Sequence, residues 1–547
     1  MRVKETNMSP EIQAAARAQT VNGVLSMIDS APGNKVMLVI DGRVVTYGWM
    51  LEQSLRVAGR LHLAGVDRHD RVAVWLPNSV AWFVAMLACA RLGACLVSLN
   101  IRLGAKEVGS LISRTECKAL VMDPAYRDGS CVRALRSIDR GDLSCLNLLV
   151  TDEVAEAILP DLQQTSLEAL GAIGDVDAVL SAAERDPCLI VATSGTTSSP
   201  KLVEHAQGSV FRHSKDVARA AGLDAPESTL LLALPLSGAF GYTAALAALS
   251  AHCPIHLFEG FEAEQVAGHL RENGITHMLG TNDMLNKILD ASPGDQPFPR
   301  LKLFGHANFD PSLTKLPQRA EAAGVLIRGF YGMSELLAGF ATQSPDAPVA
   351  RRAEAGGFPV CEEAQFRIAN PDTGSVLAVE QEGELQVLTP NRMTGYLNNV
   401  KATEDAFTSD GYFRTGDLAY LNKDGGFTFV SRINDVLRIG GYLVSPVEIE
   451  DVVSKLTNAH TCQAVAVAVG QSVRPVAFVV LRSGQVLDEA ATIELCKAQL
   501  AIYKTPIRVF AVDEIPMVNG PNGQKVNRVA LRELAQSLIE STSEAKQ

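Results

Sequence analysis

The chain has 547 residues, of which 47% are hydrophobic and 20% are charged. This balance supplies enough apolar side chains for a large buried core, and it excludes a disordered or fibrous protein. The 49 Lys and Arg residues against 61 Asp and Glu residues give a net charge of −12. A field of this sign repels nucleic acid and anionic membrane surfaces, so we expect no nucleic-acid partner.

The ten cysteines extend from Cys89 to Cys496 without a CxxC pair. This spacing fits neither a disulfide framework nor an ordinary zinc site, and it favours reduced thiols. The first residues, 1–13, contain no apolar run after their basic residues, so the sequence predicts no secretory signal. We therefore expect a cytoplasmic protein.

One segment, residues 228–258, contains no Asp, Glu, Lys or Arg and is long enough to cross a bilayer. Pro235, Gly241 and Pro254 interrupt it. Such breaks are typical of a buried strand, a glycine turn and a buried helix, and we expect no membrane span.

Up to about residue 430 the sequence alternates short β-branched runs with Ala- and Leu-rich helical stretches. Residues 71–77, 79–93 and 94–100 predict a strand, a helix and a second strand, which forms a parallel pair with a right-handed crossover. Residues 151–186 lack a long apolar run, and we expect them at the periphery. The first part is therefore a layered α/β protein.

After Arg432 the elements become short. The sequence predicts a helix over 447–456, strands over 464–470 and 475–481, and a helix over 492–500. These elements indicate a small α+β domain.

The segment VATSGTTSSPK, residues 191–201, runs from a strand end into a loop of small and hydroxylated residues. Small residues let backbone N–H groups close around an anion, while hydroxyls and a lysine add donors and charge. GxxxxGK[ST] is absent, which disfavours P-loop chemistry. The segment predicts a phosphate site; the alternative is a Ser/Thr-rich surface turn.

Five further sequence motifs follow this segment along the chain. They are GFYGMSE at 329–335, GELQVLTPNRMTGYLNN at 383–399, GYFRTGD at 411–417, SRINDVLRIGGYLVSPVEIE at 431–450 and NGQKVNR at 522–528. In this order they resemble the adenylate-forming superfamily of acyl-CoA synthetases, nonribosomal adenylation domains and luciferases. The resemblance covers nearly the whole chain, beginning at VVTYGWML and DRVAVWLPNS.

The resemblance implies a large N-terminal domain, 1–431, a hinge, 432–435, and a small, mobile C-terminal domain, 436–547. It also implies a reaction in two steps with ATP, Mg²⁺ and coenzyme A. A carboxylate attacks the α-phosphate of ATP to give an acyl-adenylate and pyrophosphate, and the thiol of CoA then displaces AMP.

By the same resemblance, Ser334 contacts the α-phosphate, Glu335 is the Mg²⁺ ligand, and Lys525 bridges the carboxylate and the α-phosphate from a C-terminal loop. Tyr331 stacks on adenine, while Asp417 and Arg432 contact the ribose. The expected ATP and AMP contacts are Thr193, Ser194, Gly195, Thr196, Thr197, Lys201, Tyr331, Asp417 and Arg432. The expected hinge residue is Asn434, and the expected path of CoA passes Gly440 and Gly441.

The acyl pocket is expected at Ser237, Gly238, Gly305 and His306. The family's proline-leucine-aromatic-histidine segment reads Pro-Leu-Ser-Gly here, so Gly238 stands where a histidine is usual and enlarges or reshapes the pocket. Three other residues depart from the family's usual sequence. Ser198 and Leu202 replace glycines of the phosphate loop, and Gln524 replaces the glycine before Lys525.

A site that selects amino acids would need a buried acid, because an unpaired buried charge is very costly. Residues 228–258 contain none. Asp283, in the later stretch LGTNDML, is a possible exception, but a helix-capping role is favoured for it. The sequence therefore predicts an acyl-CoA synthetase for a medium-sized, largely apolar carboxylic acid, acting as a monomer or homodimer. The alternatives are an adenylate former whose acceptor is a carrier-protein thiol or an amine, and a non-catalytic nucleotide-binding protein with this fold.

Overall fold

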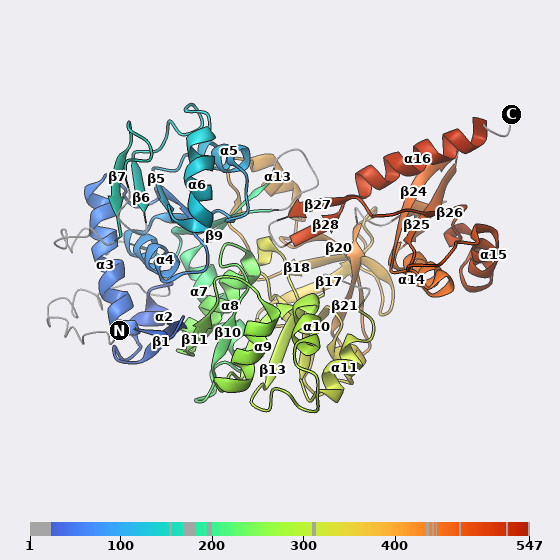
Figure 1. The fold of residues 1–547 in the computed structure, drawn as a ribbon, viewed down its shortest axis with the longest axis horizontal. Helices are drawn as coiled ribbons and strands as arrows, with labels where there is room; N and C mark the ends of the chain where they lie inside the picture. Colours follow the sequence, from blue (N-terminus) through green and yellow to red (C-terminus); the bar gives the residue numbers. More distant parts are fainter. Residues whose placement is uncertain are drawn as a thin grey trace. The chain divides into compact units, whose positions relative to one another are not determined.

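The computed structural model describes residues 23–151, 156–167, 182–193, 200–308, 313–433, 437–439, 442–444, 446–469, 472–520 and 523–544. The chain divides into two compact units, the first of residues 1–365 and 387–413 and the second of residues 366–386 and 414–547. Figure 1 follows the chain from blue to red through both units. The functional domains predicted at 1–431 and 436–547 and the hinge between them stay predictions.

The first unit contains two large sheets. In one, the neighbouring strands β11, β10, β12, β13 and β14 run parallel, and β1 joins them in parallel through β11. Its strands within this unit are β1 (Val36–Ile40), β2 (Arg43–Thr46), β10 (Leu230–Leu232), β11 (Ile255–Leu257), β12 (His277–Thr281), β13 (Leu303–Ala307), β14 (Ile327–Tyr331), β15 (Ala341–Thr342) and β16 (Gly356–Pro359).

The second sheet has the order β19-β9-β8-β4-β3-β5-β6-β7, with β7 at the edge. Its strands are β3 (Arg71–Trp75), β4 (Cys95–Ser98), β5 (Ala119–Met122), β6 (Leu148–Thr151), β7 (Gln163–Ser166), β8 (Pro187–Ala192), β9 (Leu202–Ala206) and β19 (Gly395–Tyr396). Strands β3 and β4 are connected by α4 and pair in parallel, so the predicted strand-helix-strand unit is confirmed.

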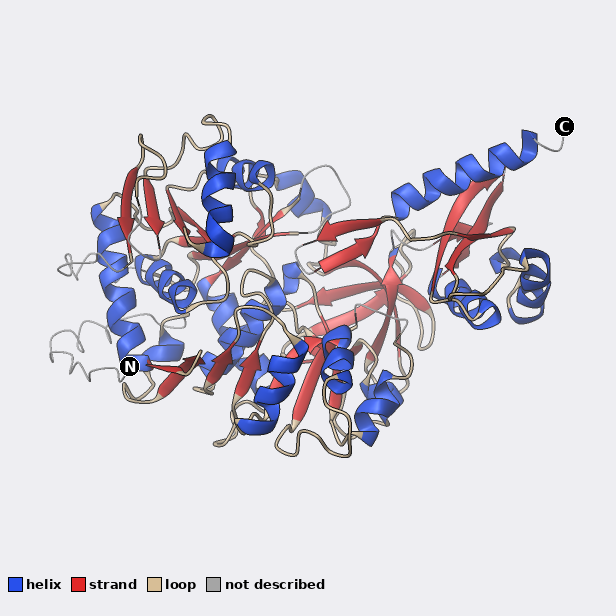
Figure 2. Cartoon of the chain, viewed as in Figure 1, coloured by secondary structure: helices blue, strands red, loops and turns tan. Residues whose placement is uncertain are grey.

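Helices flank both sheets (Figure 2). They are α2 (Ser26–Asp29), α3 (Tyr47–Leu63), α4 (Val80–Leu92), α5 (Ala105–Thr115), α6 (Tyr126–Ser137), α7 (Gln207–Ala221), α8 (Ala239–Ser250), α9 (Ala263–Glu272), α10 (Asn282–Asp290), α11 (Leu316–Ala322), the 3₁₀ helix η2 (Ser334–Leu336), α12 (Val349–Arg352) and α13 (Val400–Asp405).

The central strands of the second sheet are buried on both faces, because their alternate side chains enter different cores. Val72 and Val74 pack into the larger core, which contains α3, α4 and α8, while Ala73 and Trp75 pack into the core beneath α5 and α6. A strand buried on both faces reads as a continuous apolar run, as residues 71–77 do. This is the layered α/β arrangement that the sequence predicts.

The charge-free segment 228–258 forms the predicted buried strand and helix, β10 and α8, and also a second strand, β11, which was not predicted. Helix α8 is apolar on all sides and nearly every residue of it is buried within the protein core. Among the described residues, no helix is both long and apolar enough to cross a membrane.

The second unit contains several smaller sheets. Its strands are β17 (Gln365–Ala369), β18 (Glu382–Leu388), β20 (Phe413–Leu421), β21 (Phe427–Arg432), β22 (Leu437–Ile439), β23 (Tyr442–Val444), β24 (Thr461–Val469), β25 (Ser472–Val480), β26 (Arg508–Ala511), β27 (Met517–Gly520) and β28 (Gly523–Val526). Its helices are α14 (Pro446–Thr457), α15 (Glu489–Gln499), η4 (Ile502–Lys504) and α16 (Arg528–Glu544).

The sheet of β24, β25 and β26 carries helices on both faces. Cys462 and Ala464 share a core with α14 and α15, whereas Val465 and Val467 share one with Leu531 of α16. The predicted helices at 447–456 and 492–500 and the predicted strands at 464–470 and 475–481 are therefore confirmed as α14, α15, β24 and β25.

Candidate active site

The loop after β14, residues 332–339, carries Ser334 and Glu335 in the short helix η2. Gly332 has no room for a side chain, because an added Cβ would lie 2.4 Å from the backbone nitrogen of Gly339. Leu337, Ala338 and Gly339 follow with φ values of +62°, +56° and +59°. The left-handed conformation costs roughly 1–2 kcal/mol for each non-glycine residue, so other contacts must hold this loop.

Three buried side chains donate hydrogen bonds to carbonyl groups of this loop. His205 Nε2 lies 2.8 Å from Ser334 O, and His213 Nε2 lies 2.6 Å from Ala338 O. The Thr243 hydroxyl donates to Leu337 O. Burial lowers the pKa of both histidines to about 4, so both rings are neutral near pH 7 and carry their proton on Nε2.

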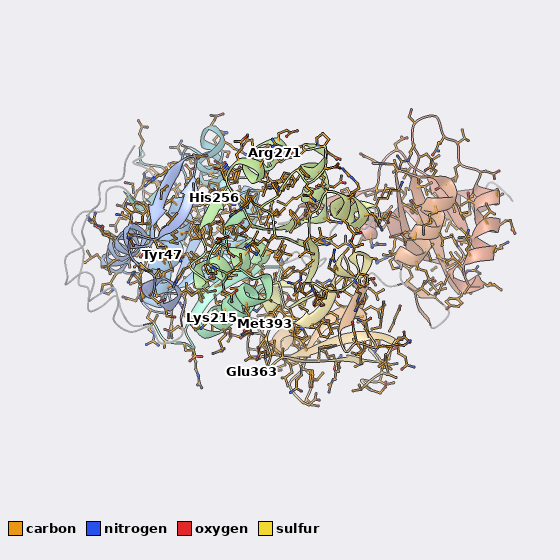
Figure 3. All side chains as sticks on the ribbon, turned by 90° about the horizontal axis from the view of Figure 1, so that it is seen from below. Tyr47, Lys215, His256, Arg271, Glu363 and Met393 are labelled. Carbon is orange, nitrogen blue, oxygen red and sulfur yellow. The ribbon has the colours of Figure 1, made fainter. Side chains whose placement is uncertain are left out.

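The Glu335 carboxylate is buried, with a relative exposure of 7%. The Tyr396 hydroxyl donates to its Oε1 over 2.9 Å, and the Met393 N–H donates to the backbone oxygen of Glu335, also over 2.9 Å. Figure 3 labels Met393. Within the described part of the chain Glu335 forms no ion pair, so its charge is available to a cation.

The described residues around Glu335 form no cluster of metal-binding side chains. No group of three or more His, Cys, Asp or Glu side chains within the described residues could hold a metal ion. Magnesium fits this arrangement, because it is commonly held by one or two carboxylates together with substrate phosphates and water.

Tyr396 also contacts the predicted phosphate loop. The ammonium of Lys201 lies 4.4 Å from the centre of the Tyr396 ring. Thr193 and Lys201 close the loop, since the Thr193 N–H donates to Lys201 O over 2.9 Å and the Lys201 N–H donates to Thr193 Oγ1 over 3.2 Å. Ser194, Gly195, Thr196 and Thr197 lie outside the described residues.

Tyr331 ends β14 directly before the 332–339 loop and is 4% exposed. Its ring meets the Phe340 ring edge-on, with centroids 6.5 Å apart. Its predicted stacking on adenine stays a prediction.

Asp417 and Arg432 lie opposite each other on the antiparallel strands β20 and β21 of the second unit. Arg432 Nε is 3.0 Å from Asp417 Oδ1, and the Asp417 carboxylate is almost completely buried. The Asp417 N–H donates to Thr415 Oγ1 over 3.1 Å. The structure thus brings these two predicted ribose ligands together.

Lys525 lies in a β-hairpin, whereas the sequence predicts a loop. Strands β27 and β28 pair antiparallel, with Lys525 opposite Val518. Each strand contains one strong β-former, Val518 in β27 and Val526 in β28, and the pairing of the two strands outweighs the glycines on which the loop prediction depended. Asn434, Gly440 and Gly441 lie outside the described residues.

Of the predicted acyl-pocket residues, Gly238 is the N-cap of α8, and Ser237 O accepts a hydrogen bond from Ser98 Oγ over 3.0 Å. Gly305 packs tightly, because an added Cβ would lie 2.4 Å from a methyl group of Leu279. His306 is 3% exposed, and neither ring nitrogen has a hydrogen-bond partner among the described residues. Burial lowers the His306 pKa to about 4.

Asp283 does not cap a helix, so that prediction is wrong. Thr281 is the N-cap of α10, and its hydroxyl accepts from the Met284 N–H over 3.2 Å. Asp283 stands in the first turn, where its carboxylate pairs with Lys287 Nζ over 2.7 Å. Because this pair lies at the surface, Asp283 provides no buried acid for a substrate ammonium.

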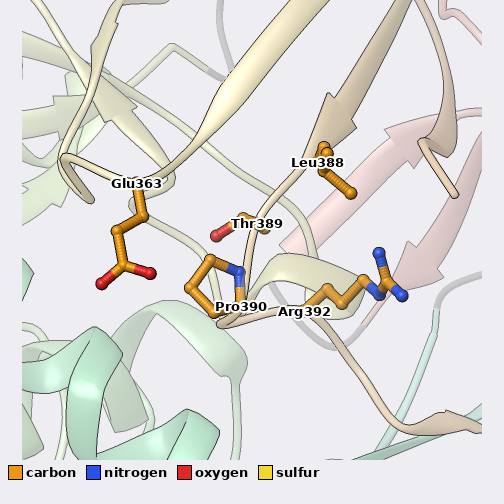
Figure 4. A pocket seen from close by; sticks show the side chains of 5 residues that line it. All are labelled: Glu363, Leu388, Thr389, Pro390 and Arg392. Atoms are coloured by element: carbon orange, nitrogen blue, oxygen red, sulfur yellow. The ribbon is translucent and has the colours of Figure 1, made fainter.

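An open pocket of about 320 Å³ lies elsewhere in the first unit (Figure 4). Its lining residues are Glu363, Leu388, Thr389, Pro390 and Arg392. Arg392 is held in place, because its guanidinium donates to Gly411 O over 2.8 Å. None of the predicted site residues lines this pocket.

The sequence prediction missed Tyr396, His205, His213 and Thr243. Tyr396 lies within the motif at residues 383–399, and this position is the sequence signal that could have identified it as a site residue. The two histidines and Thr243 carry no such signal, because their partners are 94 to 129 residues away in the sequence.

Comparison with known proteins places the chain among acyl-activating enzymes. Residues 28–397 match the family model described as "AMP-binding enzyme". The chain is 26% identical to 2-methylpropanoate–CoA ligase CCL4 of Humulus lupulus, over 97% of this chain and 98% of the relative. It is 28% identical to 2-succinylbenzoate–CoA ligase of Bacillus licheniformis, over 88% and 94% respectively.

The fold is also that of solved adenylate-forming structures. ATP-bound MatB from Rhodopseudomonas palustris superposes with a TM-score of 0.79 and 23% identity, covering 94% of this chain and 99% of that one.

Proposed function

Because the chain belongs to the AMP-binding enzyme family, we propose that it is an acid–thiol ligase that uses ATP to activate a carboxylic acid and transfers the acyl group to CoA. Curated relatives that match over most of their length are CoA ligases, which supports this reaction. The observation that carries the proposal is the buried Glu335 carboxylate, held by Tyr396 beside the end of the phosphate loop at Lys201.

The first half-reaction joins two anions, so it requires positive charge at the phosphates and fixed positions for both reactants. We assign the β- and γ-phosphates to the 193–201 loop and the α-phosphate to Ser334. Glu335 would hold Mg²⁺, which would supply positive charge at the phosphates when bound. Lys525 supplies a further positive charge between the carboxylate and the α-phosphate.

Recognition of the nucleoside is assigned to Tyr331, Asp417 and Arg432. A carboxylate has two acceptor oxygens, which suits Asp417 to a pair of ribose hydroxyls. Arg432 holds that carboxylate in place through the 3.0 Å ion pair. Tyr331, at the end of β14, is assigned to stack on adenine, because its aromatic ring is rigid.

The acid is a medium-sized, largely apolar one. The described part of 228–258 contains no acidic side chain, and Asp283 is paired with Lys287 at the surface. A substrate ammonium therefore has no buried partner in these segments. We assign Gly238, the N-cap of α8, to the acyl pocket, and its extended backbone accommodates larger residues as well as glycine.

In the second half-reaction the CoA thiol displaces AMP. We assign the hinge for the change between half-reactions to Asn434 and the path of pantetheine to Gly440 and Gly441. All ten cysteines are free thiols, which supports the predicted cytoplasmic location. The proposed assembly is a monomer or homodimer.

A pyrophosphate-release assay with a panel of carboxylic acids tests the proposal. The parent enzyme should release pyrophosphate with apolar acids of medium size, and Glu335→Gln should release little at the same Mg²⁺ concentration. Release by the parent with none of the acids would contradict an adenylating enzyme. Release with an acid but no thioester in the presence of CoA would point instead to a carrier-protein thiol or an amine as acceptor.

A further inference from the structure

The 332–339 loop is held from outside by three elements of the first unit. His205 belongs to β9, His213 to α7 and Thr243 to α8, and each donates to a different carbonyl of the loop. All three side chains are at most 3% exposed. The carbonyls they satisfy belong to Ser334, Leu337 and Ala338, so the bonds bracket Glu335 on both sides.

The positions of these donors connect the loop to the rest of the predicted nucleotide site. Strand β9 begins at Leu202, directly after Lys201, so His205 fixes Ser334 relative to the end of the phosphate loop. Helices α7 and α8 pack against each other and provide a rigid base for His213 and Thr243. Thr243 uses its hydroxyl for Leu337 O instead of for its own helix.

The backbone explains why the loop needs these bonds. Leu337, Ala338 and Gly339 are consecutive left-handed residues, and two of them have a Cβ. Consecutive left-handed residues of this kind are stable only where contacts with the surrounding structure fix their backbone conformation. Loss of one donor would leave a buried carbonyl without a partner and would remove part of the restraint on the residues that follow Glu335.

We propose that Thr243, His205 and His213 are positioning residues, which hold the 332–339 loop so that Ser334 and Glu335 are placed for adenylation before the substrates bind. This inference rests on the roles proposed above for Ser334 and Glu335. The three side chains act through the loop backbone and touch no reacting atom. Their effect is therefore expected on the rate of adenylation and on its Mg²⁺ requirement, with little effect on binding of the acid.

The test compares Thr243→Val with Thr243→Ser. Valine keeps the shape of threonine and removes the donor, whereas serine keeps the donor. Ser250→Ala is the matched control, because it removes a hydroxyl that donates to Ala247 O near the other end of the same helix. Pyrophosphate release is measured against ATP, acid and Mg²⁺ concentrations, and thermal unfolding is recorded for each variant.

We expect Thr243→Val to lower kcat by about tenfold, the effect of losing one buried hydrogen bond, and to raise the Mg²⁺ concentration for half-maximal rate. KM for the acid should stay close to the parent value, and Thr243→Ser and Ser250→Ala should resemble the parent. If Thr243→Val does not fold, His205→Met carries the same test, since methionine fills space without donating.

A donor-deficient variant with the parent kcat and Mg²⁺ dependence would overturn the positioning role. A loss of activity in Thr243→Val that also occurs in Thr243→Ser would overturn it as well. If the parent itself releases no pyrophosphate with any acid, the proposed function fails, and this outcome is distinct from an active parent with unaffected variants.

Discussion

Replacement of Tyr396 by phenylalanine removes the hydroxyl that orients the Glu335 carboxylate and leaves the ring beneath Lys201. The hydroxyl lies 2.9 Å from Glu335 Oε1, and both side chains are 7% exposed. A hydrogen bond to a charged group contributes about 1.5–3 kcal/mol, and about 1.4 kcal/mol corresponds to a factor of ten. We therefore expect kcat/KM for ATP to fall by about 10- to 100-fold in Tyr396→Phe.

The assay is pyrophosphate release at several fixed Mg²⁺ concentrations. Because the hydroxyl orients the proposed metal ligand, part of the loss should be recovered at high Mg²⁺. Tyr412→Phe is the matched control, since it removes a hydroxyl that donates to Gln365 Oε1 over 3.2 Å at an exposed position. A Tyr396→Phe enzyme with a lower melting temperature but the parent Mg²⁺ dependence would refute the reasoning.

Three further substitutions test other parts of the site. Lys525→Ala should reduce acyl-adenylate formation by about 10²- to 10³-fold while equilibrium binding of MgATP is retained, and adenylation at the parent rate would exclude the role of this lysine. Gly238→His should shift the acid profile toward smaller acids or abolish activity by overpacking, so an unchanged profile would place Gly238 outside the acyl pocket. Asn434→Pro fixes φ near −65° and should preserve pyrophosphate release while suppressing thioester formation; retention of both would show that no rotation pivots there.

Where the sequence prediction succeeded, the signal was local. Residues 71–100 contain the apolar strands and the helix of a β-α-β unit, and the breaks in 228–258 separate β10 from α8. The sequence motifs also contain both Asp417 and Arg432, which the adjacent strands β20 and β21 bring together. Hydrophobic periodicity and turn residues are properties of short segments, so they can be recognised in the sequence without knowledge of the fold.

Where it fell short, the contacts are distant in sequence. Tyr396 and Glu335 are 61 residues apart, and His205 and Ser334 are 129 apart. A buried histidine that donates to a backbone carbonyl needs no particular neighbours along the chain. Asp283 shows a second difficulty, because Thr281 and Asp283 both suit the start of a helix and only the backbone of α10 selects Thr281.

The central claim is that this enzyme forms an acyl-adenylate and passes the acyl group to CoA. A rapid-quench experiment with excess enzyme, ATP labelled at the α-phosphate and an acid selected from the panel follows the label directly. We predict labelled acyl-adenylate when CoA is omitted, and its conversion to labelled AMP with an equal amount of acyl-CoA when CoA is added. Release of labelled AMP without an acyl-adenylate, or an acyl-adenylate that CoA leaves unchanged, would contradict the claim.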